Sequence, residues 1–193
     1  MLDKRNFYIN GKWVEPFKPN DFEVINPSNE ETCAVVSLGN EEDVNSAVKA
    51  AKESFPRWSR VEKKYKISLI EKLYKIYESR WEEMTKSISL EMGAPIDWAS
   101  SAQTSSGADH IKDFIKRLKD FEFEFEFNKE SDNYIAYEPI GVCGLITPWN
   151  WPINQISLKV IPALAAGCTM ILKPSEIAPL SGMLFAEMLD ESG

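Results

Sequence analysis

Apolar residues gather in two short runs in the last third of the sequence, and a helical pattern separates them. The first run, Val142 to Thr147, contains β-branched residues and lies between Gly141 and Pro148, which is typical of a buried parallel strand. The second run is Thr169 to Leu172. Between the runs, apolar residues recur at helical spacing, at Ile153, Ile156, Val160 and Ile161. We therefore predict a strand–helix–strand unit with parallel strands.

Polar residues follow both predicted strands. Pro148, Trp149 and Asn150 come after the first strand, and the segment 173–176, Lys-Pro-Ser-Glu, comes after the second. Ligands bind α/β sheets at the carboxyl edge of parallel strands, so these two clusters form the candidate site. Asn150 carries an amide donor of the kind that stabilises an oxyanion. Lys173 and Glu176 supply a donor and an acceptor for a ribose diol, although no Gly-x-Gly-x-x-Gly motif accompanies them.

Structural roles remain open for single residues of this site. Asn150 also suits the N-cap of the following helix, with Pro152 tolerated in its first turn. Ser175 similarly suits the N-cap of a helix that begins near Pro179. Lys159, on the intervening helix, fits a solvated position and is a weak candidate. Taken together with the residues that flank them from Glu138 to Glu176, the polar clusters favour a functional role.

Short strands are predicted at the amino-terminal end. Phe7 to Val14 reads as two strands around Asn10-Gly11, a strong hairpin signal because both residues accept a positive φ. Val24 to Pro27 and Ala34 to Val36 form two further apolar runs around a polar turn. We expect them to be short strands as well.

Helical periodicity follows these strands. Asn40 suits the N-cap of a helix that ends before Pro56, with an inward face made of Val44, Ala47, Val48, Ala51 and Phe55. Residues 59–62 have the form of a capping box for a second helix. A third helix runs from Trp81 to Glu91. The pattern then predicts one long helix over 96–118, with His110 at a surface position, and a last helix over 179–192 that turns Leu180, Leu184, Met188 and Leu189 inward.

The segment from Phe121 to Phe127 alternates strictly between phenylalanine and glutamate. One face of such a strand is aromatic and the other is acidic, as in a half-buried strand. Tyr134 to Glu138 would pair with it after a polar turn over 128–133. The strand either covers its own domain or leaves it as an arm and buries the phenylalanine face against another subunit, since an exposed face of four phenylalanines is a sticky surface.

From Glu138 to Pro152 the chain resembles the NAD(P)-dependent aldehyde dehydrogenase superfamily, whose pattern Glu-Pro-x-Gly-Val-x-Gly-x-Ile-x-Pro-Trp-Asn-x-Pro it meets in order. The resemblance continues through Lys159, the segment 162–168 and the segment 173–176. It implies that Asn150 donates its amide to the oxyanion of the reaction intermediate. It also implies a set of cofactor contacts, Ile146, Thr147, Pro148 and Trp149 on the nicotinamide side and Lys173, Ser175 and Glu176 on the adenine ribose side.

The resemblance implies an α/β fold with an incomplete doubly wound, Rossmann-like parallel sheet. Residues 1–120 would hold strands and helices that pack on the cofactor domain, 121–139 an oligomerisation hairpin arm, and 140–193 the first part of the NAD-binding domain. The parent protein would oxidise an aldehyde to a carboxylic acid, with NAD as the hydride acceptor and NADP as an alternative. Because no segment here matches the cysteine nucleophile or the glutamate base, we expect this chain alone to be inactive. The alternative is a non-catalytic nucleotide-binding or oligomerisation module.

Composition narrows the choice of partners. The net charge is −8, and an acidic chain repels nucleic acid and anionic membranes, so a small-molecule aldehyde and a second copy of the chain are the expected partners. The sequence has no apolar core of a signal peptide at its start and no long apolar run, which favours a cytoplasmic protein. Three cysteines (Cys33, Cys143 and Cys168) and the single histidine have no metal-like spacing, so we expect no metal site and inert thiols.

Overall fold

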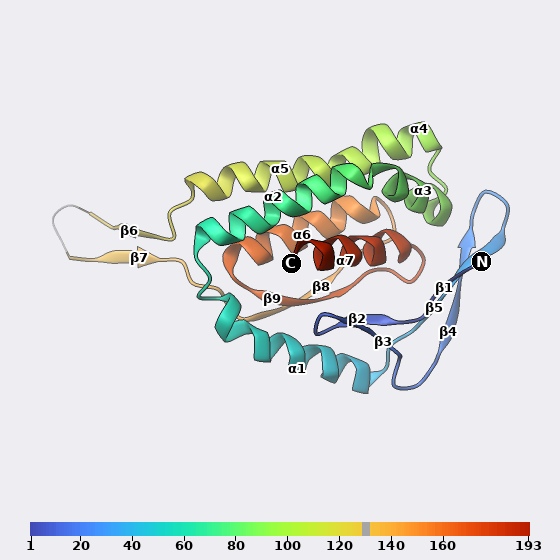
Figure 1. Ribbon diagram of the computed structural model, residues 1–193, viewed down its shortest axis with the longest axis horizontal. Helices are drawn as coiled ribbons and strands as arrows, with labels where there is room; N and C mark the ends of the chain where they lie inside the picture. The colour runs from blue at the N-terminus through green and yellow to red at the C-terminus, as the bar shows by residue number, and fades with distance from the viewer. Residues whose placement is uncertain (129–131) are drawn as a thin grey trace.

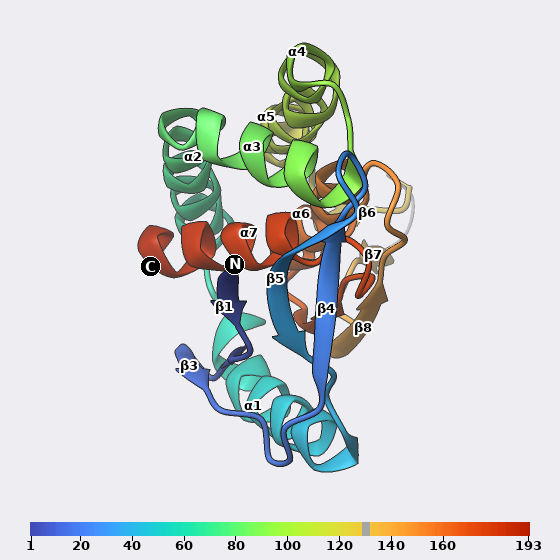
Figure 2. The ribbon, with the colours of Figure 1, turned by 90° about the vertical axis from the view of Figure 1, so that its right-hand side faces the viewer.

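Strands β8 (Val142–Ile146) and β9 (Thr169–Lys173) pair in parallel and are joined by helix α6 (Pro152–Ala166) in the computed structural model (Figure 1). The structure describes residues 1–128 and 132–193. Helix α1 (Glu41–Trp58) and α6 both pack against this pair of strands, and Figures 1 and 2 place them on opposite sides of it. The predicted strand–helix–strand unit is confirmed.

A separate small sheet stands at the amino-terminal end (Figure 2). Its order is β1-β5-β4, formed by β1 (Leu2–Lys4), β4 (Asp21–Asn26) and β5 (Glu31–Ser37). Between β1 and β4, strands β2 (Phe7–Ile9) and β3 (Lys12–Val14) form the predicted hairpin, with a φ of 54° at Asn10 and 71° at Gly11. The pairing of β1 with β5 was not predicted, because three residues that precede the hairpin carry no distinct pattern.

Helices make up most of the remaining chain. They are α2 (Lys63–Ser79), α3 (Trp81–Met92), α4 (Ile96–Trp98), α5 (Ser105–Asp120) and α7 (Leu180–Ser192). Between α4 and α5 the chain makes a π-helical turn, η1 (Ala99–Thr104). The predicted long helix is thus continuous but locally widened. Gly93 ends α3 in the left-handed region, with a φ of 76°.

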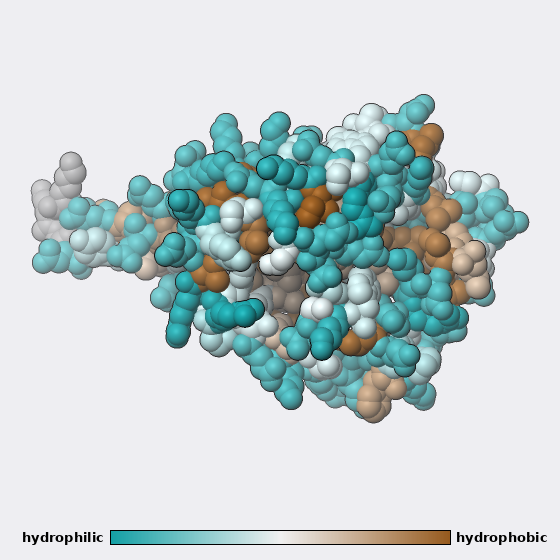
Figure 3. Space-filling model, viewed as in Figure 1, coloured by the Kyte–Doolittle hydropathy of each residue, from teal (hydrophilic) through white to brown (hydrophobic). Residues whose placement is uncertain are grey.

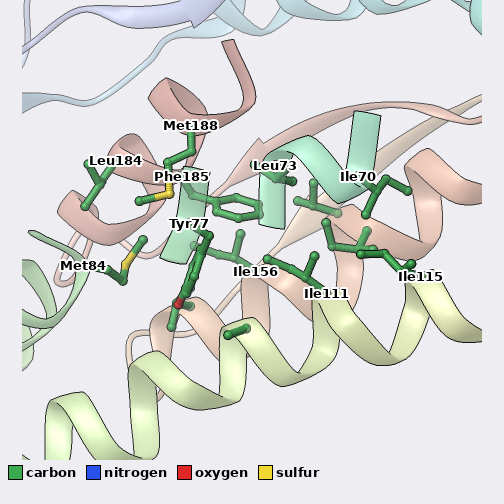
Figure 4. Packing of buried hydrophobic residues seen from close by; sticks show 14 of the residues in the cluster. Ile70, Leu73, Tyr77, Met84, Ile111, Ile115, Ile156, Leu184, Phe185 and Met188 are labelled. Carbon is green, nitrogen blue, oxygen red and sulfur yellow. The ribbon is translucent and has the colours of Figure 1, made fainter. Parts of the chain in front are cut away.

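The main core lies among α2, α5, α6 and α7 (Figure 4). Tyr77, Phe185 and Ile156 are fully buried there, and the Tyr77 hydroxyl donates a hydrogen bond of 2.8 Å to the carbonyl oxygen of Thr104. Gly107 allows this close packing, because a Cβ atom at that position would lie 2.5 Å from the Tyr77 oxygen. Burial of this apolar surface is the main stabilisation of the fold.

Two helix boundaries differ from the predictions. Helix α1 continues through Pro56 to Trp58, because the proline is exposed and the next turn closes with a bond of 2.9 Å from the Ser59 N–H to the Phe55 carbonyl oxygen. Ser59 ends α1 instead of capping α2, and α2 begins without a side-chain cap. The capping box predicted over 59–62 is therefore wrong. The true capping box lies at the start of α1, between Asn40 and Asp43.

Strands β6 (Glu124–Glu126) and β7 (Tyr134–Ala136) form an antiparallel hairpin that projects from the rest of the molecule (Figure 1). Phe125 and Phe127 are exposed, whereas Phe123 packs against the main core. The predicted hairpin is present, but its first strand covers Glu124–Glu126 and not the whole of the alternating segment, and its second strand ends at Ala136. Its predicted polar turn includes residues 129–131, which lie outside the described residues.

The molecular face drawn in Figure 3 is mostly hydrophilic, with apolar residues in separate patches. Within residues 1–128 and 132–193, no helix is long and apolar enough to cross a membrane.

A buried carboxylate caps helix α7. Glu91, at the end of α3, is 1% exposed and accepts hydrogen bonds from the backbone N–H groups of Leu180 and Ser181. The positive end of the α7 dipole favours the negative charge, but loss of hydration dominates. Burial raises the pKa of Glu91 to about 7, against the lowering effect of the hydrogen bonds from Ser181 and Leu180. This contact links the amino-terminal helices to α7.

We predict that this carboxyl group makes the stability depend on pH. Between its ordinary pKa of 4.5 and about 7, the folded chain holds a proton that the unfolded chain has lost. The free energy of unfolding therefore falls as the pH rises through this window, by roughly 3 kcal/mol at most. Urea unfolding from pH 5 to 8 should show this fall in the wild type and not in Glu91→Gln. Glu82→Gln, an exposed change on the same helix, is the control, and parallel wild-type and Glu91→Gln curves would contradict the prediction.

Candidate functional site

The carboxyl ends of β8 and β9 bring the two predicted polar clusters together. Ile146 is the register partner of Lys173, and the Thr147 N–H donates a hydrogen bond of 3.2 Å to the Lys173 carbonyl oxygen. After this point the chain turns away from the sheet on both strands. Thr147 is buried, whereas Ile146 is 75% exposed and Trp149 is 48% exposed. The site is thus an open edge with exposed apolar and polar side chains.

Lys173 and Glu176 form an ion pair on this edge. The Lys173 Nζ lies 2.6 Å from Glu176 Oε2, and both side chains are partly exposed. The hydrogen bond from Lys173, together with a backbone hydrogen bond, lowers the pKa of Glu176. The pair presents a carboxylate and an ammonium side by side, which suits recognition of neighbouring hydroxyl groups.

Ser175, between these two residues, has a local role. Its hydroxyl oxygen accepts a hydrogen bond of 3.3 Å from the Ile177 N–H. It does not cap α7, because Glu91 accepts hydrogen bonds from the first N–H groups of that helix. The capping alternative for Ser175 is therefore wrong.

Asn150 is exposed at the end of the loop that leads into α6. The N-cap position of α6 is occupied by Trp151, and no side-chain hydrogen bond caps the helix. Pro152 stands in the first turn as predicted. The capping alternative for Asn150 thus has no support in the geometry, and its amide is left available on the open edge.

A groove of about 380 Å³ runs between α1 and the sheet and ends at the same edge. Its lining residues are Val44, Val48, Lys52, Val142, Gly144, Leu145, Ile146, Ile171 and Lys173. Val44 was expected to face inward but is 53% exposed, because it stands over this groove. Gly144 leaves the floor of the groove open, since a Cβ atom there would have no heavy atom within 4 Å.

A second group of contacts involves Trp151, the residue after Asn150, and side chains on α4, α5 and α6. The rings of Trp98 and Trp151 meet edge to face, with centroids 5.1 Å apart. His110 Nε2 lies 2.7 Å from Asn154 Oδ1, and this contact bridges α5 to α6. His110 is therefore half-buried and bonded, not at the surface position that was predicted, because α5 packs along α6.

Sequence patterns do not predict this second group of contacts. Trp98 belongs to no motif, and the π-helical turn that follows it has no pattern of its own. The signals that could have pointed toward it are the tryptophan content and the Trp-Asn-Trp order around Asn150. Lys159, the weak candidate on α6, contacts Gln155, with its Nζ 3.4 Å from the side-chain oxygen.

None of the three thiols lies at the open edge. Cys143 is within β8, one residue from its amino-terminal end, and Cys168 is buried just before β9 begins. Cys33 is in β5. Burial raises the pKa of both the Cys33 and the Cys143 thiols, which disfavours the reactive thiolate.

Comparison with known proteins relates this geometry to one family. Residues 13–193 match the model of the aldehyde dehydrogenase family. A 3-succinoylsemialdehyde-pyridine dehydrogenase from a Pseudomonas species is 48% identical over 194 residues, which cover 100% of this chain and 40% of the relative. The chain thus spans about two fifths of the length of the curated relatives that it matches.

Solved structures are similar over the same region. The crystal structure of an aldehyde dehydrogenase from Bartonella henselae has a TM-score of 0.98 and 55% identity, covering 100% of this chain and 40% of that one. A mutant of aldehyde dehydrogenase C from Pseudomonas syringae, solved with NAD⁺ and octanal, has a TM-score of 0.95 and 43% identity, covering 98% of this chain and 38% of that one.

Proposed function

The chain belongs to the aldehyde dehydrogenase family, and we propose that it supplies part of the active site for the NAD-dependent oxidation of an aldehyde to a carboxylic acid. One observation carries the proposal. The register of β8 and β9 places the Lys173–Glu176 pair beside the turn that leads to Asn150. A cofactor contact and an oxyanion donor therefore share one open edge of a parallel sheet, which is where such sheets bind ligands.

The described residues fit a dinucleotide. The Glu176 carboxylate would accept hydrogen bonds from a ribose diol, and Lys173 would donate one to the same ribose. The open floor at Gly144 admits a flat group against the sheet, because no atom fills the place of a Cβ there. The end of β8 and the turn after it would face the nicotinamide side, through Ile146, Thr147, Pro148 and Trp149. Ser175 would complete the set of cofactor contacts. When bound, NAD supplies the acceptor for the hydride that the substrate carbon loses.

Asn150 acts on the substrate oxygen. As a nucleophile adds to the aldehyde carbon, negative charge develops on that oxygen, and the side-chain amide N–H of Asn150 donates a hydrogen bond to it. The exposed position of Asn150 and the absence of a cap bond at the start of α6 support this role. The nucleophile comes from outside this chain, since its own thiols lie in β5, in β8 and just before β9, away from the edge. We assign the general base to the same missing part, because no segment of the chain matches the motif that carries it.

We further propose a role for each of three parts of the chain. Residues 140–193 begin an NAD-binding domain whose doubly wound parallel sheet is completed by further strands, and residues 1–120 pack on it. In the described part of the chain, β8 pairs with β9 alone, which leaves sheet edges for such strands. Residues 121–139 form the oligomerisation arm. The exposed phenylalanines of that arm also support the alternative function, a non-catalytic module for oligomerisation or nucleotide binding.

We predict that Asn150→Ala in the full-length enzyme lowers the turnover number about 10²- to 10³-fold, as is typical for the loss of one oxyanion donor. Folding and NAD binding should stay unchanged, since the side chain caps no helix. Steady-state kinetics and NAD titration measure the two effects. A variant with normal turnover and a lowered melting temperature would return Asn150 to a structural role.

Glu176→Gln is predicted to weaken the preference for NAD over NADP. A carboxylate about 5 Å from the extra phosphate repels it by roughly 3 kcal/mol at an effective dielectric constant of about 20, and the partial exposure of Glu176 reduces this value. We expect a change of about tenfold in the ratio of the two dissociation constants. Lys173→Met is the opposite control, since it removes the cation that attracts phosphate. An unchanged ratio in Glu176→Gln would refute the assignment.

The β6–β7 arm is predicted to bury its aromatic face between subunits. Phe125 is 36% exposed and Phe127 is 63% exposed, so Phe125→Asp should place a charge in that interface and reduce the oligomer size. Light scattering measures the molecular mass. Glu124→Gln, one residue earlier in the same strand and on its opposite face, is the control. A folded Phe125→Asp variant with the wild-type mass would exclude the arm from the interface.

The 193-residue chain alone is predicted to form no NADH from NAD and aldehydes. The reaction needs a thiolate at the open edge, and Cys33, Cys143 and Cys168 are partly or fully buried elsewhere. The assay follows absorbance of NADH with a panel of aldehydes. Turnover that disappears in Cys143→Ser or Cys168→Ser would contradict the prediction, and NAD binding without turnover would agree with the non-catalytic module.

A further inference from the structure

The side chain of Lys66, on α2, is buried without a hydrogen-bond acceptor. It is 5% exposed, and within residues 1–128 and 132–193 no group accepts a hydrogen bond from its ammonium or forms an ion pair with it. Lysine is seldom buried unless it is paired. Glu62, one turn earlier, is exposed and does not pair with it. Lys63, in contrast, donates to two backbone carbonyl oxygens, at 3.0 and 3.1 Å. The buried lysine of this helix is therefore the one that lacks an acceptor.

The indole of Trp58 lies beside this ammonium group. The Lys66 Nζ is 5.8 Å from the centroid of the ring, a cation–π contact that offsets part of the charge. The indole Nε1 is itself buried and has no hydrogen-bond partner among the described residues, although buried indole N–H groups usually have one. We call Lys66 Nζ and Trp58 Nε1 the donor pair. Two unbonded donors in one place indicate a position for a shared acceptor.

The C-terminal end of α6 borders the donor pair but does not supply that acceptor. Gly167 ends the helix with a φ of 88°, and a Cβ atom at this position would lie 2.8 Å from Lys66 Nζ. The negative end of the helix dipole is therefore close to the ammonium group. The carbonyl oxygens of Ala163 and Leu164 accept hydrogen bonds from the N–H groups of Cys168 and Gly167 instead. Burial lowers the pKa of Lys66, against a raising effect of the Cys168 thiol, so these surroundings do not fully replace water around the charge.

A carboxylate matches the donor pair better than water or phosphate does. A water molecule would accept from the indole N–H but would leave the positive charge without a counter-ion. A phosphate would bring nearly two negative charges to the C-terminal end of α6, which repels them. A carboxylate carries one charge and two oxygens, so one oxygen accepts from the ammonium group and the other from the indole N–H.

The donor pair lies near the point where the β6–β7 arm joins the rest of the molecule (Figure 1). Ser59 Cα and Pro139 Cγ, which precede α2 and β8, are each 3.5 Å from the position of a Cβ atom at Gly167. Because the chain covers 40% of the Pseudomonas relative, more than half of such an enzyme lies outside residues 1–193. Buried charges are usually paired with another protein group, so the rest of the enzyme is the expected source of the carboxylate.

We propose that the donor pair binds one carboxylate, contributed by an aspartate or glutamate of the protein outside residues 1–193. The contact joins the turn between α1 and α2 to the remainder of the enzyme. This inference rests on the part of the proposed function that places the remainder of the enzyme outside this chain, and it does not depend on Asn150 or on NAD. Lys66 is then an interface residue within the enzyme and not a solvated lysine.

The test measures the melting temperature of the full-length protein. Lys66→Met leaves the bound carboxylate buried without a cation, so the melting temperature should fall by about 5 °C or more. Lys66→Arg keeps the charge and should recover most of this loss. Trp58→Phe keeps a ring but removes the N–H, so it should give a smaller fall. Lys64→Met, an exposed change on the same helix, is the control. An unchanged or raised melting temperature in Lys66→Met would show a buried charge without a counter-ion, and it overturns the inference.

A crystal structure of the full-length wild type identifies the source of the carboxylate, even where Lys66→Met does not fold. An aspartate or glutamate oxygen from outside residues 1–193, at hydrogen-bond distance from Lys66 Nζ, supports the inference. Water, a free anion, an empty position or a carboxylate of residues 1–193 in another subunit overturns it.

Sodium formate tests for a free anion separately. A rise in melting temperature that exceeds the rise in sodium chloride at equal concentration, and that Lys66→Met abolishes, shows a free anion at the donor pair and overturns the protein source. Equal effects of the two salts agree with a site that the protein already fills. None of these measurements follows aldehyde oxidation, so a failure of the proposed catalytic roles does not change their outcome.

Discussion

The parallel pairing of β8 with β9 is the constraint on which the rest of the site depends. Parallel neighbours cannot be joined by a tight turn, so the chain must cross over, and α6 is that crossover. Both strands then end at the same edge, with Ile146 beside Lys173. The residues that follow the strands are separated by more than twenty positions in the sequence but meet in space, at the carboxyl edge where sheets of this kind bind ligands.

The strand pair is stable because helices cover both of its faces. Helix α1 packs on one side. It is joined to β9 by a hydrogen bond of 2.8 Å from the Thr169 hydroxyl to the Ala51 carbonyl oxygen. On the other side, α6 is buried between the sheet and the core that surrounds Tyr77 and Phe185. Glu91 adds a polar contact to α7. Burial of a charged carboxylate costs free energy, and this cost is reduced by the two N–H groups that donate to it and by protonation of the carboxyl group. The strand pair that carries the candidate site is therefore held in place by helices on both of its faces.

Regular periodicity made most of the fold predictable. Strands β8 and β9, the Asn10-Gly11 hairpin, the α3 stop at Gly93 and strand β6 within the alternating segment 121–127 all follow from local patterns. The errors came where tertiary contacts override local signals. Pro56 stays within α1 because its ring points to solvent, and residues 59–62 resemble a capping box although Ser59 ends the preceding helix.

The two groups of residues described around Asn150 also differ in how well the sequence predicts their positions. Lys173 and Glu176 are three residues apart, and Asn150 follows its strand directly, so short-range patterns were enough to place them at one edge. The contact between Trp98 and Trp151 joins residues more than fifty positions apart and depends on a π-helical turn and a strained left-handed residue. Neither feature produces a periodic pattern in the sequence. Side chains that follow strand ends are thus placed by short-range patterns and can be read from sequence, whereas the contact between Trp98 and Trp151 is set by long-range packing and emerges only in three dimensions.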